Sequence, residues 1–159
     1  NDCKYGHDIK DNVIRISLLK AGTHPDHLQD QGQHVFTYAL LPHSGDFVEG
    51  NVVQEAYALN DPMQTAEGVC TFGAESFVTF DNDQVELDAV KKSEDGKYLV
   101  IRFHEFAGSA QKVTVRPGFA FREWTECDLR ERPLGEWSRD KEIALDLHAY
   151  EIKTILISL

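Results

Sequence analysis

The first part of the chain carries apolar patterns that are typical of β-strands. In residues 13–19 (VIRISLL) every second residue from Ile14 is apolar, and residues 34–41 (HVFTYALL) form an aromatic and β-branched run. Both patterns predict strands. Between them, residues 21–33 (AGTHPDHLQDQGQ) offer no face that could be buried, so they predict a loop. Loops of this length are longer than the usual ~4–6 residues and are more often functional.

A single short helix is predicted over residues 51–59. Val52, Ala56 and Leu59 follow one another at spacings of four and three, which places them on one side of a helix. Pro62 follows, and a proline disfavours helical geometry in the residue before it. The helix is therefore expected to end at this point.

From Ser76 onward the chain is a series of short β-forming runs separated by turn-forming residues. The predicted strands are residues 77–80, 85–91, 98–106, 112–116, 120–127, 143–147 and 150–159. Because no helical pattern lies between them, they favour antiparallel sheets packed as a sandwich. The chain is therefore predicted to be all-β. Its parts are residues 1–63, a connecting segment at 64–75, and a small sandwich at 76–159.

Composition excludes several classes of protein. Of 159 residues, 42% are hydrophobic, which suffices for one core or two small ones. With 16 Lys and Arg against 27 Asp and Glu, the net charge is −11, so a nucleic acid would repel the chain. No apolar run reaches the roughly 18 to 20 residues of a membrane span, so no membrane partner is expected. Three distant cysteines without a CxxC pair favour a reducing, cytoplasmic location.

The predicted loop and the run after it hold a group of potential metal ligands. These residues are His24, Asp26, His27, Asp30 and His34. Imidazole and carboxylate groups hold zinc or manganese when they converge. Nothing in the sequence makes them converge, because a proline interrupts the loop. A polar surface loop is the favoured interpretation, and no metal site is assigned to this chain.

Other catalytic motifs are missing or ambiguous. There is no G-x-S-x-G elbow, no glycine-rich phosphate loop and no dinucleotide fingerprint. Pairs of acidic residues could act as acid and base, but the sequence does not select one. Cys70 and Cys127 lie in apolar neighbourhoods, which favours buried structural thiols. Trp124, Trp137 and Tyr150 could stack on sugars, although packing within a sandwich is the more usual role of such residues.

Longer strings carry a resemblance to a known family. Residues 1–26 (NDCKYGHDIKDNVIRISLLKAGTHPD) and 30–46 (DQGQHVFTYALLPHSGD) resemble the C-terminal β region of glycoside hydrolase family 38, the retaining α-mannosidases, and in particular its bacterial and cytosolic branch. Residues 89–115, 127–134 and 150–157 resemble the small terminal sandwich of the same proteins. Lys20 and Ala149 depart from the arginine and proline that are usual in the family.

The resemblance implies a fragment rather than a complete enzyme. It implies the end of a large β-sandwich of the galactose-mutarotase-like supersandwich type, with one short helix, followed by a small antiparallel β-sandwich. The family hydrolyses α-mannosidic bonds with a zinc ion, an Asp nucleophile and a second acidic residue. All of these lie in an N-terminal catalytic domain whose motifs are absent here. The expected partners are that domain and an α-mannoside, and no catalytic residue is assigned.

One set of residues is expected to border the sugar pocket of the parent enzyme. It is chosen for its polar clustering around the long loop and consists of Lys4, Tyr5, Asp30, Gln31, Gly32 and His34. Turn stabilisation is the competing role for the same residues. Two other functions stay open. A stand-alone carbohydrate-binding module predicts an exposed aromatic platform at Trp124 or Trp137, and an assembly module predicts dimers formed through an exposed apolar face.

Overall fold

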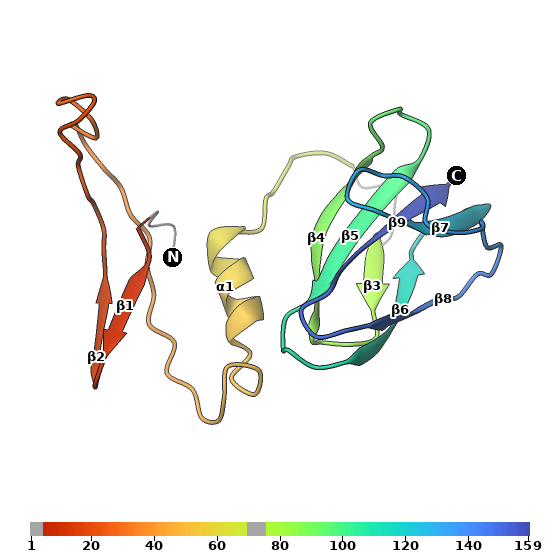
Figure 1. Cartoon of the computed structure of the whole chain (residues 1–159), viewed down its shortest axis with the longest axis horizontal. Helices are drawn as coiled ribbons and strands as arrows, with labels where there is room; N and C mark the ends of the chain where they lie inside the picture. Colours follow the sequence, from red (N-terminus) through yellow and green to blue (C-terminus); the bar gives the residue numbers. More distant parts are fainter. Residues whose placement is uncertain (1–4, 70–75) are drawn as a thin grey trace. The chain divides into compact units, whose positions relative to one another are not determined.

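The computed structural model describes residues 5–69 and 76–159, and the chain divides into two compact units. The first unit is Asn1–Glu67 and the second is Gly68–Leu159. Figure 1 shows a hairpin and a helix in the first unit and a set of twisted strands in the second. Lys4, Cys3 and Cys70 lie outside the described residues. Each unit is considered by itself below.

The first unit contains one hairpin and one helix. Strand β1 (His7–Lys10) pairs antiparallel with β2 (Val13–Ile16), and the tight turn between them places Asp11 at a φ of 53°. Helix α1 (Val52–Asn60) agrees with the sequence prediction to within one residue. It ends as expected just before Pro62, where the backbone N–H of Asp61 donates to the carbonyl of Tyr57.

Two strand predictions in this unit need correction. Residues 34–41 form no strand, although their composition favours one, and β2 ends at Ile16 rather than at residue 19. A strand is stable only where a neighbouring strand satisfies its backbone hydrogen bonds. Within the described ranges no strand of a sheet runs beside residues 34–41, so the β-forming side chains there lie on an irregular segment.

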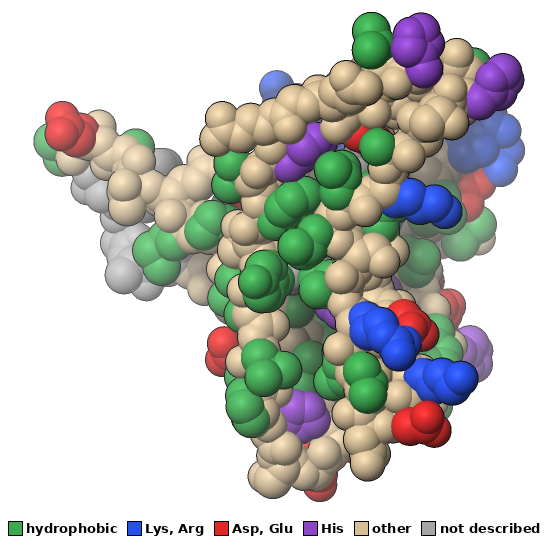
Figure 2. Space-filling model, turned by 90° about the vertical axis from the view of Figure 1, so that its left-hand side faces the viewer, with side chains coloured by type: hydrophobic (Ala, Val, Ile, Leu, Met, Phe, Trp, Pro, Cys, Tyr) green, Lys and Arg blue, Asp and Glu red, His purple; other side chains and the backbone are tan. Residues whose placement is uncertain are grey.

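The described residues of the first unit enclose no core. No residue between 5 and 69 is buried, and large apolar side chains such as Ile14 and Leu40 are 63% and 80% exposed. Figure 2 shows hydrophobic side chains open at the surface. A two-stranded hairpin alone is marginally stable in water, and contiguous apolar surface of this kind marks an interaction site.

The second unit is a sandwich of two antiparallel sheets. One sheet has the order β3-β6-β8 and the other has the order β4-β5-β9-β7. The strands are β3 (Val78–Phe80), β4 (Val85–Lys92), β5 (Leu99–Glu105), β6 (Gln111–Pro117), β7 (Glu123–Cys127), β8 (Ile143–Leu147) and β9 (Ile152–Ser158). The predicted strand positions are confirmed, except that β7 and β9 begin two or three residues later than expected.

The core lies between these two sheets. Ile101 and Phe103 of β5 and Ile155 and Ile157 of β9 are fully buried against apolar residues of β6 and β8. Burying one such side chain contributes about 1.5–3 kcal/mol relative to leaving it in water. The two central strands therefore supply much of the stability of the unit.

A second apolar cluster covers part of the opposite face of the four-stranded sheet. Val100 and Leu156 point away from the main core and pack with Cys127, Tyr98 and Trp137. The segment after β7 folds back along that strand, since the backbones of Trp124 and Ser138 exchange hydrogen bonds. This cover explains why Val100 interrupts the alternation of β5: the strand is buried on both faces.

A buried carboxylate ties two turns together at one end of the sandwich. Glu105 ends β5 with 0% exposure, at the position where the alternation of Ile101 and Phe103 places an inward side chain. Its Oε1 accepts a hydrogen bond from the N–H of Ala107, and its Oε2 accepts from those of Gly108 and Tyr150. Burial alone would raise the pKa of this carboxyl, but the backbone donors outweigh burial and lower the pKa below its ordinary value of 4.5.

Neutralising this carboxylate should destabilise the sandwich. We expect Glu105→Gln to lower the free energy of unfolding by about 1–3 kcal/mol at pH 7, because an amide cannot accept all of these bonds. A folded pKa below the unfolded one stabilises the protein fully above pH 4.5 and progressively less as the pH falls through the folded pKa. The difference between the two proteins should therefore shrink on acidification, as measured by urea unfolding from pH 7 to pH 3.

The exposed Glu142 provides the matched control for this experiment. Glu142→Gln should leave the unfolding curve within about 0.5 kcal/mol of the parent, as is usual for surface substitutions. Equal effects of the two substitutions at pH 7 would contradict the assigned role of Glu105.

Candidate functional site

The residues expected to border a sugar pocket partly converge around the long loop. The Tyr5 hydroxyl donates to Oδ2 of Asp30 at 3.0 Å, in a half-buried position. The Nε2 of His34 lies 2.8 Å from the backbone carbonyl oxygen of Asp30, to which it donates. The structure thus brings together three of the six predicted residues, which we call the Tyr5–Asp30–His34 cluster.

The backbone at this cluster has an unusual conformation. Asp30 has a φ of 56° and Gly32 a φ of 134°, both in the region that most side chains avoid. Gln31 points back into the loop, where its Nε2 donates to the carbonyl of His27 at 3.2 Å. Gly32 therefore allows the chain to bend, and the Gln31 side chain stabilises the loop through its hydrogen bond to His27. Asp30 links the loop to Tyr5. Lys4, the remaining predicted residue, lies outside the described part of the chain.

The remaining potential ligands of the loop do not form a metal centre. Asp26 accepts a hydrogen bond from the backbone N–H of Leu28 at 2.9 Å, a local turn contact. Among residues 5–69 and 76–159, no three His, Cys, Asp or Glu side chains lie close enough to hold a metal ion. The zinc that the resemblance implies is expected in the N-terminal catalytic domain of the parent, and that expectation stays a prediction.

What the cluster can do chemically is hydrogen bonding. A phenol, a carboxylate and an imidazole together donate to and accept from hydroxyl groups. The His34 ring also stacks on Phe36 with centroids 5.9 Å apart and planes 6° apart, which fixes its orientation. The arrangement suits the rim of a polar ligand site.

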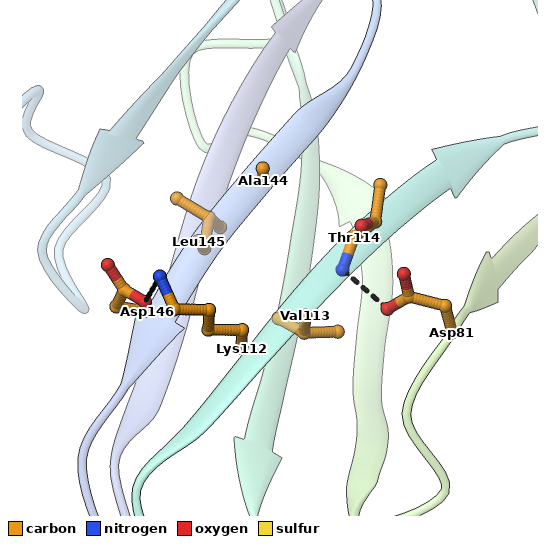
Figure 3. A pocket seen from close by; sticks show the side chains of 7 residues that line it. All are labelled: Asp81, Lys112, Val113, Thr114, Ala144, Leu145 and Asp146. Carbon is orange, nitrogen blue, oxygen red and sulfur yellow. Dashed lines mark hydrogen bonds and ion pairs between the residues drawn. The ribbon is translucent and has the colours of Figure 1, made fainter.

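A shallow hollow on the three-stranded sheet has a structural explanation (Figure 3). The Asp81 carboxylate accepts a hydrogen bond from the backbone N–H of Thr114 at 2.7 Å, and Lys112 pairs with Asp146 at 3.2 Å. The bond from Thr114, helped by Arg116, holds the pKa of the Asp81 carboxyl below its ordinary value. Asp81 thus continues the β3–β6 pairing through its side chain, and these contacts do not point to a ligand.

The two tryptophans do not form an exposed platform. Trp124 is half-buried against the main core, and its Nε1 donates to the backbone carbonyl of Asp140. Trp137 is half-buried against Tyr98, with ring centroids 4.9 Å apart. A stand-alone carbohydrate-binding module would need an exposed aromatic platform at these residues. Neither tryptophan provides one, because both rings pack against neighbouring side chains. Tyr150, in contrast, is 70% exposed.

Residues 84–155 match the model of a known family, described as the glycosyl hydrolases family 38 C-terminal beta sandwich domain. The match covers most of the second unit, from the start of β4 to the middle of β9. The chain belongs to glycosyl hydrolase family 38. This confirms the family resemblance and agrees with the β-sandwich architecture of the second unit.

Curated relatives of the family 38 chain are much longer than the chain itself. Alpha-mannosidase 2C1 of Homo sapiens is 35% identical over 167 residues, which cover 100% of this chain and 16% of that protein. Alpha-mannosidase G of Dictyostelium discoideum is 30% identical over 163 residues, or 97% of this chain and 15% of that protein. An alpha-mannosidase of Saccharomyces cerevisiae is 40% identical over 118 residues, or 73% and 11%. No solved structure matches the chain.

The cellular location of the family 38 chain stays a prediction. Within the described ranges, every helix is too short or too polar to cross a membrane. That finding does not identify a compartment, so the cytoplasmic location inferred from the cysteines remains an expectation.

Cys127 of the family 38 chain is buried, as predicted. It is 5% exposed and packs in the second apolar cluster. Burial, helped by the nearby carboxylates of Glu131 and Asp128, raises the pKa of its thiol to about 11. A thiol that stays protonated at neutral pH is a poor nucleophile, so this residue has a packing role.

Alkylation should report this burial directly. In a Cys3→Ser, Cys70→Ser variant, Cys127 is the remaining thiol. We expect iodoacetamide to modify it at pH 7.5 at least about a hundredfold more slowly in the native state than in urea, because raising a pKa by two units lowers the thiolate fraction a hundredfold. Mass spectrometry against time provides the measurement. Equal native and unfolded rates would contradict the assignment.

Proposed function

We propose that this chain is a non-catalytic C-terminal part of a larger α-mannosidase, in which it packs against the remainder of the polypeptide and stabilises it. The observation that carries the proposal is the contrast between the two units. The second unit buries its own apolar core, whereas the described residues of the first unit leave every side chain at least partly exposed. The named relatives, which extend far beyond the matched region, support the same interpretation.

The first unit is proposed to join a β-sandwich formed mainly by preceding residues of the parent. Many side chains of strand β2 and of residues 34–41 are apolar. All of them are at least partly exposed in the described structure. A neighbouring sheet would cover those side chains and could include residues 34–41 as one of its strands. The large sandwich implied by the resemblance is such a neighbour.

The Tyr5–Asp30–His34 cluster is proposed to border the sugar pocket of the parent, together with the other residues predicted from the sequence, Lys4, Gln31 and Gly32. Its support is the hydrogen-bonded convergence of three polar groups at a backbone held in an unusual conformation. Such strained positions are common at ligand sites. Hydrolysis of terminal α-D-mannosidic bonds, the nucleophile, the general acid and the zinc ion are assigned to the N-terminal catalytic domain, so the isolated chain is expected to be inactive.

The proposed packing of the rest of the polypeptide on the first unit can be tested in the full-length parent. We expect Ile14→Asp to lower the melting temperature of the parent by several degrees, because a charge would enter a buried apolar contact. Leu134→Asp, in the second unit, is the matched control, since the two residues are 63% and 68% exposed in this chain. Differential scanning fluorimetry provides the measurement.

The isolated chain distinguishes this proposal from self-assembly. There both substitutions should change the melting temperature little, because both side chains face water. Equal effects of the two substitutions in the parent would refute the proposed packing. Concentration-dependent dimers of the isolated chain that Ile14→Asp abolishes, together with no effect of Ile14→Asp in the parent, would favour an assembly module instead.

The border role of the cluster makes a separate kinetic prediction. We expect Asp30→Ala in the parent to raise the KM for an aryl α-mannoside or to lower kcat by roughly two- to tenfold, as for loss of one hydrogen bond of about 0.5–1.5 kcal/mol. Asp26→Ala removes a carboxylate of the same loop that accepts from a neighbouring backbone N–H, and it should leave both constants unchanged. Unaltered kinetics in both variants, at equal thermal stability, would reduce the cluster to a turn-stabilising role.

A further inference from the structure

A hollow of about 470 Å³ lies on the outer face of the four-stranded sheet, at the end held by Glu105. Strands β4, β5 and β9 and the turn before β9 contribute to its walls. Besides Glu105, the residues that line it are Asp88, Arg102, His104, Phe106, Tyr150 and Ile152. Its volume falls within the range of about 300–1,000 Å³ that is usual for small-molecule sites.

The aromatic wall of the hollow is exposed yet held in place. Tyr150 is 70% exposed and has a φ of 59°, a conformation that is rare for an aromatic residue. Its ring lies against Gly108, where an added Cβ would come within 2.4 Å of the Tyr150 hydroxyl oxygen. The same oxygen of Glu105 accepts hydrogen bonds from the N–H groups of Gly108 and Tyr150, both at 2.9 Å. The buried Glu105 carboxylate therefore holds the backbone of Tyr150 and also the backbone of Gly108, against which the exposed Tyr150 ring packs.

A polar pair stands beside this wall. His104 of β5 places its Nδ1 at 2.9 and 3.0 Å from the two carboxylate oxygens of Asp88. Asp88 lies at a β-bulge of β4, where the register shifts between Leu87 and Ala89. Bulges re-aim side chains and are frequent beside ligand sites. Because Nδ1 faces Asp88, Nε2 is the ring nitrogen that can meet a ligand.

Arg102 supplies a fixed donor group to the same hollow. Its Nε donates to the Thr154 hydroxyl at 3.1 Å, and its Nη2 donates to the backbone carbonyl of Leu129 at 3.4 Å. These bonds orient the guanidinium and leave Nη1 for other acceptors. An aromatic face, a carboxylate, an imidazole and a guanidinium therefore surround one open space.

From this arrangement we propose that the hollow binds a neutral pyranoside. A pyranose ring has an apolar C–H face that stacks on an aromatic ring and a rim of hydroxyls that pair with charged and polar side chains. A phosphorylated ligand is disfavoured, because Asp88 and Glu105 oppose Arg102 and the chain carries a net charge of −11. The choice of an α-mannoside as the expected sugar rests on the proposed function.

The proposal is tested on the full 159-residue chain by NMR titration. Methyl α-D-mannopyranoside is added to the ¹⁵N-labelled protein, with the corresponding methyl glucoside and methyl galactoside in parallel. We expect saturable shifts of the amides of Ala107, Gly108 and Tyr150, with the mannoside binding most tightly. No saturable shift of these amides with any of the three sugars would overturn the proposal. The proposal would also be overturned if these amides shifted with protein concentration in the absence of sugar, because such shifts would indicate a contact between copies of the chain.

Three substitutions separate stacking from a structural role of the ring. Tyr150→Ala should weaken binding by about tenfold or more, whereas Tyr150→Phe should retain it within about threefold, since the ring rather than the hydroxyl carries the stacking. Asp88→Asn should also weaken binding, and it tests the site even if Tyr150→Ala fails to fold, because Asp88 is a surface residue. Tyr38→Ala removes an aromatic ring that is 63% exposed in the first unit, and it should leave binding unchanged.

Whether the hollow binds a sugar is tested independently of the proposed function, and only the expected preference for the mannoside rests on it. Binding that is equal in the wild type, Tyr150→Ala and Asp88→Asn would refute the site, whatever the activity of the parent enzyme. Tight binding of the glucoside or galactoside in place of the mannoside would support the hollow and contradict the link to α-mannosides. Failure of the packing and kinetic tests in the parent would leave the titration result intact.

Discussion

Exclusion of water from the space between the two sheets is the constraint on which the second unit depends. The central strands β5 and β9 each present fully buried residues to that space, among them Phe103 and Ile155. Their opposite faces are also partly dry, because Val100 and Leu156 are covered by the segment that follows β7. With both faces covered, these strands hold a fixed register, since a slip of one residue would exchange every inward and outward side chain. This register also determines which residues of β4, β5 and β9 lie around the hollow on the outer face.

Glu105 connects that core to the surface. A buried charge is costly unless hydrogen bonds replace the lost water, and three backbone N–H groups do so here. Those donors belong to two turns that are about 40 residues apart in sequence, one after β5 and one before β9. The carboxylate therefore fixes the position of Tyr150, whose ring would otherwise move with an exposed turn. Glu105 thus stabilises the sandwich and also holds the backbone of Tyr150, whose ring lines the hollow.

The two units differ in how far each one buries its own apolar side chains and pairs its own backbone. The second satisfies its own backbone and apolar groups, which is what a domain requires to fold alone. The first has hairpin pairing and a nine-residue helix, both shorter than isolated elements need for stability in water. Its Tyr5–Asp30 bond nevertheless joins residues 25 apart, so the long loop has a defined anchor. A segment with ordered polar contacts and uncovered apolar side chains suits a role as part of a larger sandwich.

Local pattern determined the regular elements. The sequence alone predicts helix 52–60 to within one residue and strand 143–147 without error, because spacing and turn residues act over a few positions. Residues 34–41 have the composition of a strand but form none, because strand pairing is a property of the fold rather than of the segment. Asp30 and His34 of the loop cluster are four residues apart, so the local sequence already places them near each other, whereas Tyr5 lies 25 residues from Asp30 and reaches it only through the fold. The hollow was not: bringing Asp88, His104 and Tyr150 together requires a bulge, a strand register and a buried carboxylate, and these exist only once the sheets have packed.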